Sequence, residues 1–225
     1  MVPVMRTVLL LSLAAACGGE PEVPPVSRVW PALGTMMSAA AWGADTARLG
    51  RAMGAAHDTA ARPGAAAAPP SLDSLRFEIR RETGVALAAG DIQEGDALDR
   101  AALVLVGVAD SALLDVGGQF LWVGPRATRR VVGIADPASS LNQLATVEMR
   151  GGSVSTAAHT GNEGSVSVTV LAPTGVAADA WSTALLSLGC ERALAIRQVS
   201  VVCADSGRVR WTRDLEGRVA VHHRP

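Results

Sequence analysis

Asp179 and Thr183 are the pair of residues best suited to bind a metal ion, because of their side chains and their positions in the chain. They stand four positions apart in ADAWSTALL, after the strand-like segment SVSVTVLAP and at the start of a helix-like stretch. Residues four apart share one face of a helix, with Cβ atoms about 6 Å apart. Their carboxylate and hydroxyl would supply hard oxygen ligands for Mg²⁺, and a helix start also favours a phosphate group nearby. The structural alternative is that Asp179 caps its own helix while the Thr183 hydroxyl bonds back to a main-chain carbonyl.

Two further segments combine acidic residues with glycines. The segment 90–100, GDIQEGDALDR, places four carboxylates within nine residues and enters a predicted helix. Such a run could help to hold a metal, although it also suits a solvated helix start whose acidic groups complement the helix dipole. The segment 115–119, DVGGQ, carries paired glycines that would allow the close approach of a ligand or form a tight turn.

Composition excludes several other mechanisms. The chain of 225 residues has 49% hydrophobic and 18% charged residues, which suffices for a buried core and rules out general disorder. Its 20 Lys and Arg positions are all arginine, so no lysine can act as a nucleophile, a Schiff base or a P-loop phosphate ligand. The formal net charge of -1 argues against a nucleic acid as partner, which would require a basic face. None of the four histidines has metal-ligand spacing to another, so we do not expect a zinc site.

The elements expected around these residues are a mixture of strands and helices. They lack the strict alternation of a doubly wound parallel sheet, so we predict an α+β fold in one domain with mixed sheets and packed helices. An Ala/Pro/Gly-rich linker is expected at 61–71. Helices are expected at 44–61, 96–106 and 176–196. Strands are expected at 30–41, 75–87, 111–124 with a Gly-Gly turn, 131–137, 145–158 around a second Gly-Gly, 165–173 and 199–214 as a hairpin.

The N-terminus predicts an exported protein. Residues 1–17 have one early positive charge, a short apolar run and small residues that lead directly to Cys17. This pattern is typical of a bacterial lipoprotein signal, in which Cys17 becomes the lipid-anchored first residue; the alternative is an ordinary signal peptide. Residues 18–29 would then form a flexible tether and 30–221 the folded domain. We therefore expect a protein on the periplasmic side, held to the membrane by its lipid.

Cys190 and Cys203 are the cysteines that remain after such processing. An oxidising compartment would permit a bridge between them. Cys190 falls in an apolar helical run and Cys203 in a strand-like segment, so we predict two buried free thiols.

In chain order, these pieces resemble the bacterial FAD:protein FMN transferases, the ApbE-like family of flavin-transferring lipoproteins. The resemblance covers most of residues 30–215, and the segment 168–189 is its most specific part. The matching segments are ALGTMM (32–37), GDIQEGDALDRA (90–101), LLDVGGQ (113–119), VVGIADP (131–137), GGSVSTAA (151–158) and VTVLAPTGVAADAWSTALLSLG (168–189).

The resemblance implies an activity and a set of site residues. Members bind FAD with Mg²⁺ at its pyrophosphate and transfer FMN to a threonine hydroxyl of an acceptor protein, releasing AMP. By motif match, Asp179 and Thr183 would be catalytic and would bind Mg²⁺ through their side chains, with Ser182 beside them. A further Mg²⁺ ligand would come from the turn at Asp91 through a main-chain carbonyl. The residues implied at the flavin nucleotide are Leu33, Gly34, Thr35, Glu94, Gly117 and Gly118.

The chain departs from the family pattern at several points. Ala88 stands where members normally carry an aspartate, and Asp96 where an aromatic residue usually follows the glycine. A His-containing stretch that ends in Asp-Pro-x-x-Gly is missing before SVSVTV, and the linker at 61–71 replaces a longer section. Two alternatives to the transferase follow: a non-catalytic binding or scaffold lipoprotein, and an FAD pyrophosphatase in which water replaces the acceptor.

Overall fold

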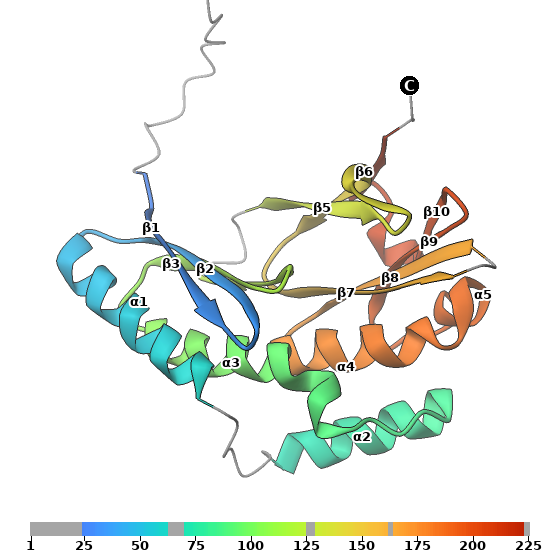
Figure 1. Ribbon diagram of the computed structural model, residues 1–225, viewed down its shortest axis with the longest axis horizontal. Helices are drawn as coiled ribbons and strands as arrows, with labels where there is room; N and C mark the ends of the chain where they lie inside the picture. Colours follow the sequence, from blue (N-terminus) through green and yellow to red (C-terminus); the bar gives the residue numbers. More distant parts are fainter. Residues whose placement is uncertain (1–23, 63–69, 125–128, 162–163, 223–225) are drawn as a thin grey trace, which may run out of the picture.

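An eight-stranded antiparallel sheet runs through the centre of the computed structural model, which describes residues 24–62, 70–124, 129–161 and 164–222. Its strand order is β1-β2-β3-β4-β7-β8-β9-β10, so sequence neighbours pair except where β5 and β6 leave the sheet (Figure 1). The strands are β1 (Val26–Ala32), β2 (Thr35–Trp42), β3 (Ser111–Val116), β4 (Gln119–Val123), β7 (Gly152–Gly161), β8 (Gly164–Ala172), β9 (Ser200–Asp205) and β10 (Arg208–Trp211).

Helices cover one face of this sheet and a small second sheet covers part of the other (Figure 1). The second sheet is also antiparallel, in the order β11-β6-β5. Its strands are β5 (Arg130–Asp136), β6 (Ser139–Met149) and β11 (Val219–Val221). The helices are α1 (Thr46–Ala61), α2 (Pro70–Thr83), α3 (Gln93–Leu105), α4 (Gly175–Leu186) and α5 (Gly189–Ala193), with short 3-10 turns η1 (Ala89–Ile92) and η2 (Arg213–Leu215). The predicted α+β fold is confirmed.

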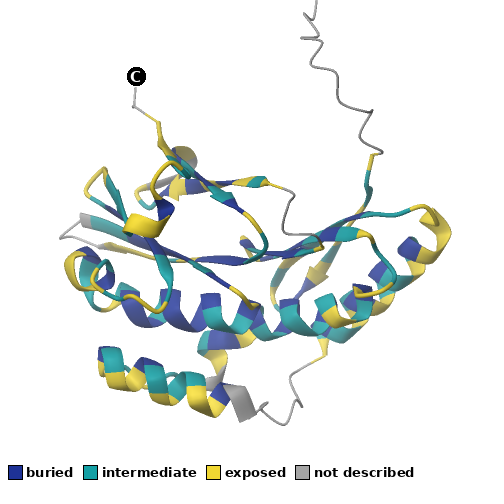
Figure 2. Ribbon diagram, turned by 180° about the vertical axis from the view of Figure 1, so that it is seen from behind, coloured by how far each residue is buried: buried dark blue, intermediate teal, exposed yellow. Residues whose placement is uncertain are grey.

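Three hydrophobic clusters hold these layers together. One lies between α1, α3 and strands β1 to β4, and a second between α2, α4, α5 and strands β8 and β9. The third lies between the small sheet and the opposite face of the large one. Helix α4 is buried on several sides rather than amphipathic, because the sheet covers one side and α2 packs on another (Figure 2).

The segment 75–87 is helical up to Thr83, so its prediction as a strand was wrong. The alternation of Leu75, Phe77 and Ile79 suggested a half-buried strand, but Phe77 is 68% exposed. The residues that pack against α4 are instead Leu72, Leu75 and Ile79, at the three- and four-residue spacing of a helix. Gly84 then follows the helix at a φ of 79°, in the left-handed region that glycine tolerates.

Other element boundaries also differ from expectation. The predicted strand at 30–41 is a hairpin of β1 and β2, which pair around a turn at Leu33 and Gly34. Strand β1 begins at Val26, so it includes residues 26–29 that we assigned to the tether. The predicted long helix at 176–196 is divided into α4 and α5 at Gly189, where φ is 71°. The remaining expected helices and strands are present.

Cys190 and Cys203 form a disulfide, with Cα atoms 5.6 Å apart, so the prediction of free thiols was wrong. Cys190 on α5 and Cys203 on β9 both lie in the cluster between the helices and the sheet. Burial was expected correctly, but the sequence spacing did not show that α5 crosses β9 at this point. Among the described residues, no helix is both long and apolar enough to cross a bilayer. The predicted signal, residues 1–17 with Cys17, lies outside the described residues.

Candidate functional site

Helices α3 and α4 cross at a direct contact between two glycines. A Cβ atom placed on Gly95 would lie 2.3 Å from the carbonyl oxygen of Gly175, and one placed on Gly175 would lie 2.4 Å from the carbonyl oxygen of Gly95. Real Cβ atoms do not approach backbone oxygen this closely, so both positions require glycine. The crossing brings the first turn of α3 against the first turns of α4.

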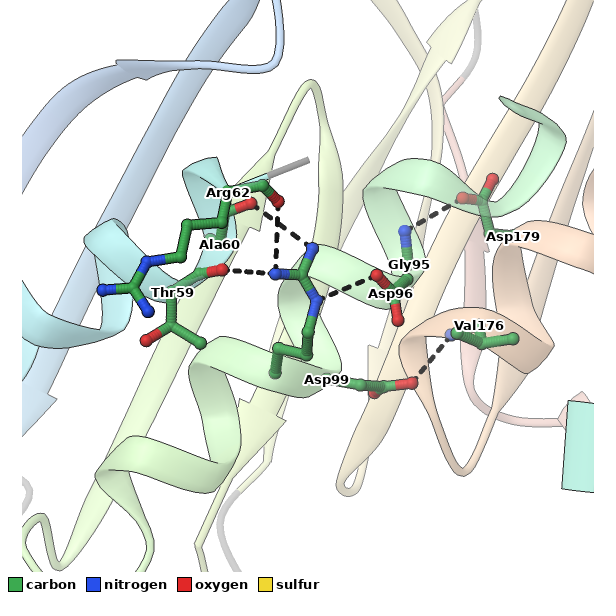
Figure 3. Close-up of polar contacts among 9 residues, drawn as sticks. Thr59, Ala60, Arg62, Gly95, Asp96, Asp99, Val176 and Asp179 are labelled. Carbon is green, nitrogen blue, oxygen red and sulfur yellow. Dashed lines mark hydrogen bonds and ion pairs between the residues drawn. The ribbon is translucent and has the colours of Figure 1, made fainter. Parts of the chain in front are cut away.

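Each helix caps the other through a carboxylate (Figure 3). Asp99 of α3 accepts hydrogen bonds from the Gly175 and Val176 N–H groups at 2.6 and 2.9 Å, at the start of α4. Asp179 of α4 accepts one from the Gly95 N–H at 2.9 Å, at the start of α3. These N–H groups have no partner within their own helices, so the two carboxylates satisfy them and also complement the helix dipoles.

Neighbouring polar contacts fix the crossing to the sheet and to α1. The Gln119 side-chain amide of β4 donates to the Gly175 carbonyl at 2.8 Å and to the Ser153 hydroxyl at 3.2 Å. Arg100 of α3 binds Asp96 at 2.9 Å and also donates to the main-chain carbonyl of Thr59 at the end of α1 (Figure 3).

Asp179 is the most perturbed carboxylate in this region. The residue is 9% exposed, and burial raises its pKa from 3.8 to about 6. The hydrogen bond from the Gly95 N–H lowers the pKa, while the nearby charges of Glu94 and Asp91 raise it. The carboxylate therefore lies in a field of other carboxylates, which a bound cation would compensate.

Glu94 and Asp115 extend this field to the turn between β3 and β4. A Cβ on Gly117 would lie 2.7 Å from Glu94 Oε1, so the carboxylate of Glu94 lies directly against this turn. Asp115 accepts from the Gly118 N–H at 2.9 Å and from the Ser38 hydroxyl at 3.4 Å. Burial raises the pKa of both carboxyl groups, and the charge of Asp115 raises that of Glu94 further. We call Asp91, Glu94, Asp115 and Asp179 the acidic cluster.

The β1–β2 turn lies beside the same place. The Gly117 N–H donates to the Met36 carbonyl at 3.2 Å, and Met37 pairs with Val116 in the sheet. Leu33 and Gly34 form the turn at positive φ, and Thr35 begins β2. The structure thus brings together the three segments that hold the six residues implied at the flavin nucleotide: the β1–β2 turn, the start of α3 and the β3–β4 turn.

The other predicted metal ligands, Asp91, Ser182 and Thr183, differ in the hydrogen bonds that they make. The Asp91 carboxylate accepts from the Ala88 N–H at 2.7 Å, so it shapes the turn, which leaves a main-chain oxygen as the ligand that the resemblance implies. The Ser182 hydroxyl is directed towards the sheet, since it is 1% exposed and bonds to Ser155 at 3.1 Å and to the Asp179 carbonyl at 3.0 Å. Thr183 is half-buried and its hydroxyl makes no hydrogen bond to another described residue.

The structural alternative for Asp179 was that it caps its own helix. Asp179 does cap a helix, but not its own. Helix α4 is capped by Thr174, whose side chain accepts from the Ala177 N–H, while Asp179 caps α3 instead. Sequence reasoning missed Asp99 and Gln119, because only the fold brings them to Gly175. The signal for Asp99 was its place in the segment 90–100, where it was counted among four carboxylates without a role of its own.

The donor set is compatible with a hard divalent cation. In the described ranges, no three His, Cys, Asp or Glu side chains converge on one point as a complete metal site. A cation at the acidic cluster would therefore draw on Asp179, the Thr183 hydroxyl and main-chain oxygen near Asp91, together with oxygens of its substrate. Mg²⁺ is commonly bound in this way, with few carboxylates and several phosphate or water oxygens.

Solved structures share this fold. The ApbE protein from Thermotoga maritima superposes with a TM-score of 0.62, at 15% identity over 86% of this chain and 99% of that one. The flavin transferase ApbE from Vibrio cholerae gives 0.64, at 13% identity over 87% and 100%. The flavinyl transferase ApbE from Pseudomonas stutzeri in its apo form gives 0.58, at 14% identity over 86% and 96%.

Comparison of the sequence with known protein families is more specific than comparison of the folds. No curated protein matches it. The ApbE family matches residues 29–163, which is more than half of the chain and includes the β1–β2 turn, α3 and the β3–β4 turn. The matched range contains Glu94 and Asp115 of the acidic cluster. The chain belongs to the ApbE family.

Proposed function

We propose that this protein transfers the FMN part of FAD to a threonine hydroxyl of an acceptor protein, with Mg²⁺ at the acidic cluster. The observation that carries the proposal is the burial of Asp179 among other carboxylates, which raises its pKa to about 6 beside the glycine turns. Family membership and the names of the similar structures, which are flavin transferases, support the same reaction class.

In the proposed reaction the threonine oxygen attacks the phosphorus of the FMN phosphate. A new P–O bond forms, the P–O bond to the AMP phosphate breaks, and the hydroxyl proton is released with AMP as the leaving group. When bound, Mg²⁺ would neutralise charge on the pyrophosphate. The protein's own contribution is positioning: the Gly95–Gly175 contact fixes Asp179, and the β1–β2 and β3–β4 turns allow a nucleotide to approach the main chain.

Two other activities fit parts of the site. The hydrogen bond between Asp179 and the Gly95 N–H gives this carboxylate a structural role, which favours a non-catalytic binding or scaffold protein as the second candidate. An FAD pyrophosphatase would use the same groups with water as the acceptor.

One incubation separates the three. Purified protein is mixed with FAD, Mg²⁺ and a threonine-containing acceptor peptide, and both AMP and peptide mass are followed. The transferase predicts AMP and a mass gain of one FMN group. AMP and free FMN without a mass gain would identify a pyrophosphatase, and neither product would identify a non-catalytic protein.

We also propose that the mature protein is exported and anchored through a lipid on Cys17. The disulfide between Cys190 and Cys203 supports export, because disulfides persist mainly in oxidising compartments. Expression of the full chain in a bacterial host tests this: wild type should fractionate with membranes, and Cys17→Ser should be soluble after export. Membrane association of Cys17→Ser would contradict the anchor.

A further inference from the structure

Two adjoining hollows form a groove whose lining includes no residue of the acidic cluster. The larger has a volume of about 940 Å³ and the smaller about 340 Å³, and both are lined by Leu171, Pro173 and Ser200. The walls come from the loop between α5 and β9, the segment after β10 and the β6–β7 turn. We call this the arginine groove.

The arginine groove concentrates positive charge in a chain whose net charge is -1. Arg197 and Arg213 line the larger hollow, while Arg150 and Arg218 line the smaller one. Among the described lining residues of the two hollows, the one carboxylate is Asp214 in the larger hollow. It already accepts a hydrogen bond from Ser200. With Asp214 and the Glu148 carboxylate that pairs with Arg150 both counted, the four arginines leave an excess of two positive charges.

The four arginines are held differently. Arg218 donates to the Glu148 main-chain carbonyl at 3.1 and 2.6 Å, and Arg150 pairs with the Glu148 carboxylate at 2.7 Å. Arg197 and Arg213 are exposed, and their guanidinium groups make no ion pair with any described residue. Two charges are thus fixed in place and two are free to bind an anionic group.

Apolar side chains share the lining with these charges. Leu171 lines both hollows, and Leu194, Ile196 and Val199 line the larger one. A compact anion such as phosphate would leave this apolar lining without a partner. This arrangement is complementary to an extended chain that carries both acidic and apolar side chains.

The disulfide holds one wall of the groove in shape. The bond between Cys190 and Cys203 encloses residues 194–200, which supply seven lining residues and belong to no helix or strand before Ser200. A wall that is already ordered loses less conformational entropy when a ligand binds, so the crosslink favours binding.

From these observations we infer that the arginine groove binds an acidic, extended peptide segment of a partner protein. The inference rests on the proposed function only in taking that partner to be the flavin acceptor. Peptide binding at the groove is independent of FAD and Mg²⁺.

The test is a fluorescence anisotropy titration without FAD or Mg²⁺. The probe is a fluorescein-labelled peptide of alternating glutamate and valine, and the matched peptide carries lysine in place of glutamate. The variant Arg197→Glu with Arg213→Glu is compared with Arg48→Glu with Arg51→Glu on α1, which makes the same change in charge at exposed positions elsewhere. Thermal unfolding checks that both are folded, and Arg197→Gln with Arg213→Gln serves as a milder second variant.

The inference predicts that the groove variant weakens binding of the acidic probe at least tenfold, while the α1 variant changes it less than twofold. The lysine peptide should not bind, and removal of the disulfide should weaken binding. Equal binding by the groove and α1 variants would overturn the inference. Displacement of the probe by millimolar inorganic phosphate at fixed ionic strength would also overturn it, because it would identify a simple anion site. Failure of the proposed function would show separately, as the lack of AMP release from FAD.

Discussion

The surroundings of Asp179 have opposite effects on its ionisation. Its hydrogen bond to the Gly95 N–H favours the carboxylate, but burial and the neighbouring carboxylates disfavour it, and its pKa is raised to about 6. In the protein without a cation, the ionised form is therefore destabilising. A carboxylate in such surroundings is expected to be stabilised by a bound metal ion rather than by a cationic side chain of the protein.

The raised pKa of Asp179 predicts how stability depends on pH. Between its unfolded value of 3.8 and its folded value of about 6, the native state holds the proton and the unfolded state does not. The free energy of unfolding should therefore fall as pH rises through this window, by about 1 kcal/mol between pH 5 and pH 7.5 from this group alone. Urea unfolding without Mg²⁺ measures this. Asp179→Asn keeps an acceptor for Gly95 and should flatten this part of the profile; a profile parallel to wild type would contradict the assignment.

From the sequence, Asp179, Glu94 and the paired glycines could be named as candidate site residues, because carboxylates and glycines in short segments point to ligand sites. The structure places them near one another. The roles of Asp99 and Gln119 could not be predicted, since their partner Gly175 is more than 50 positions away and only the fold brings them together.

The crossing of α3 and α4 is the element-level feature on which the site depends. It places the start of each helix against a carboxylate of the other, so the position of Asp179 is set by how closely the helices approach. Gly95 and Gly175 permit that approach.

A larger side chain at the crossing should therefore destabilise the protein. Gly95→Ala would place a Cβ 2.3 Å from the Gly175 carbonyl oxygen and force the helices apart, at a cost of about 3 kcal/mol or more in the free energy of unfolding. The matched control is Gly54→Ala on α1, where a Cβ meets open space and alanine should stabilise the helix by up to ~1 kcal/mol. Chemical unfolding compares the two; equal stabilities would show that the glycine contact is not tight.

The elements differed in how far the sequence predicted them. Helices α1 and α3 were recognisable because their buried residues follow helical spacing, such as Leu49, Met53, Ala56 and Ala60 of α1. Helix α2 was missed because Leu75, Phe77 and Ile79 alternate, although Phe77 is exposed and only the contact with α4 reveals which residues pack. Such contacts depend on tertiary structure, which local periodicity does not contain.

At the scale of the whole molecule, the disulfide links the last helix to the penultimate strand of the large sheet. Cys190 and Cys203 are 13 positions apart, and the bond restrains the loop that forms one wall of the arginine groove. The sequence could not establish this bond, because two cysteines at this spacing are equally compatible with free thiols.

Removal of the crosslink should lower stability. The variant Cys190→Ala with Cys203→Ala should lose about 3 kcal/mol in the free energy of unfolding, as expected for a loop of this length. Urea unfolding with and without a reductant measures the effect: reductant should lower wild type to near the variant and leave the variant unchanged. A wild type insensitive to a strong reductant under unfolding conditions would show that the bond does not form in the folded protein.

Titration calorimetry of Mg²⁺ into the protein with FAD at pH 7.5 measures whether the acidic cluster holds a divalent cation beside FAD. At this pH the Asp179 carboxylate is ionised and available. We expect saturable Mg²⁺ binding by wild type and its loss in Asp179→Asn, with urea unfolding as the check that the variant is folded. Equal binding by the variant, or no binding by wild type, would contradict this expectation.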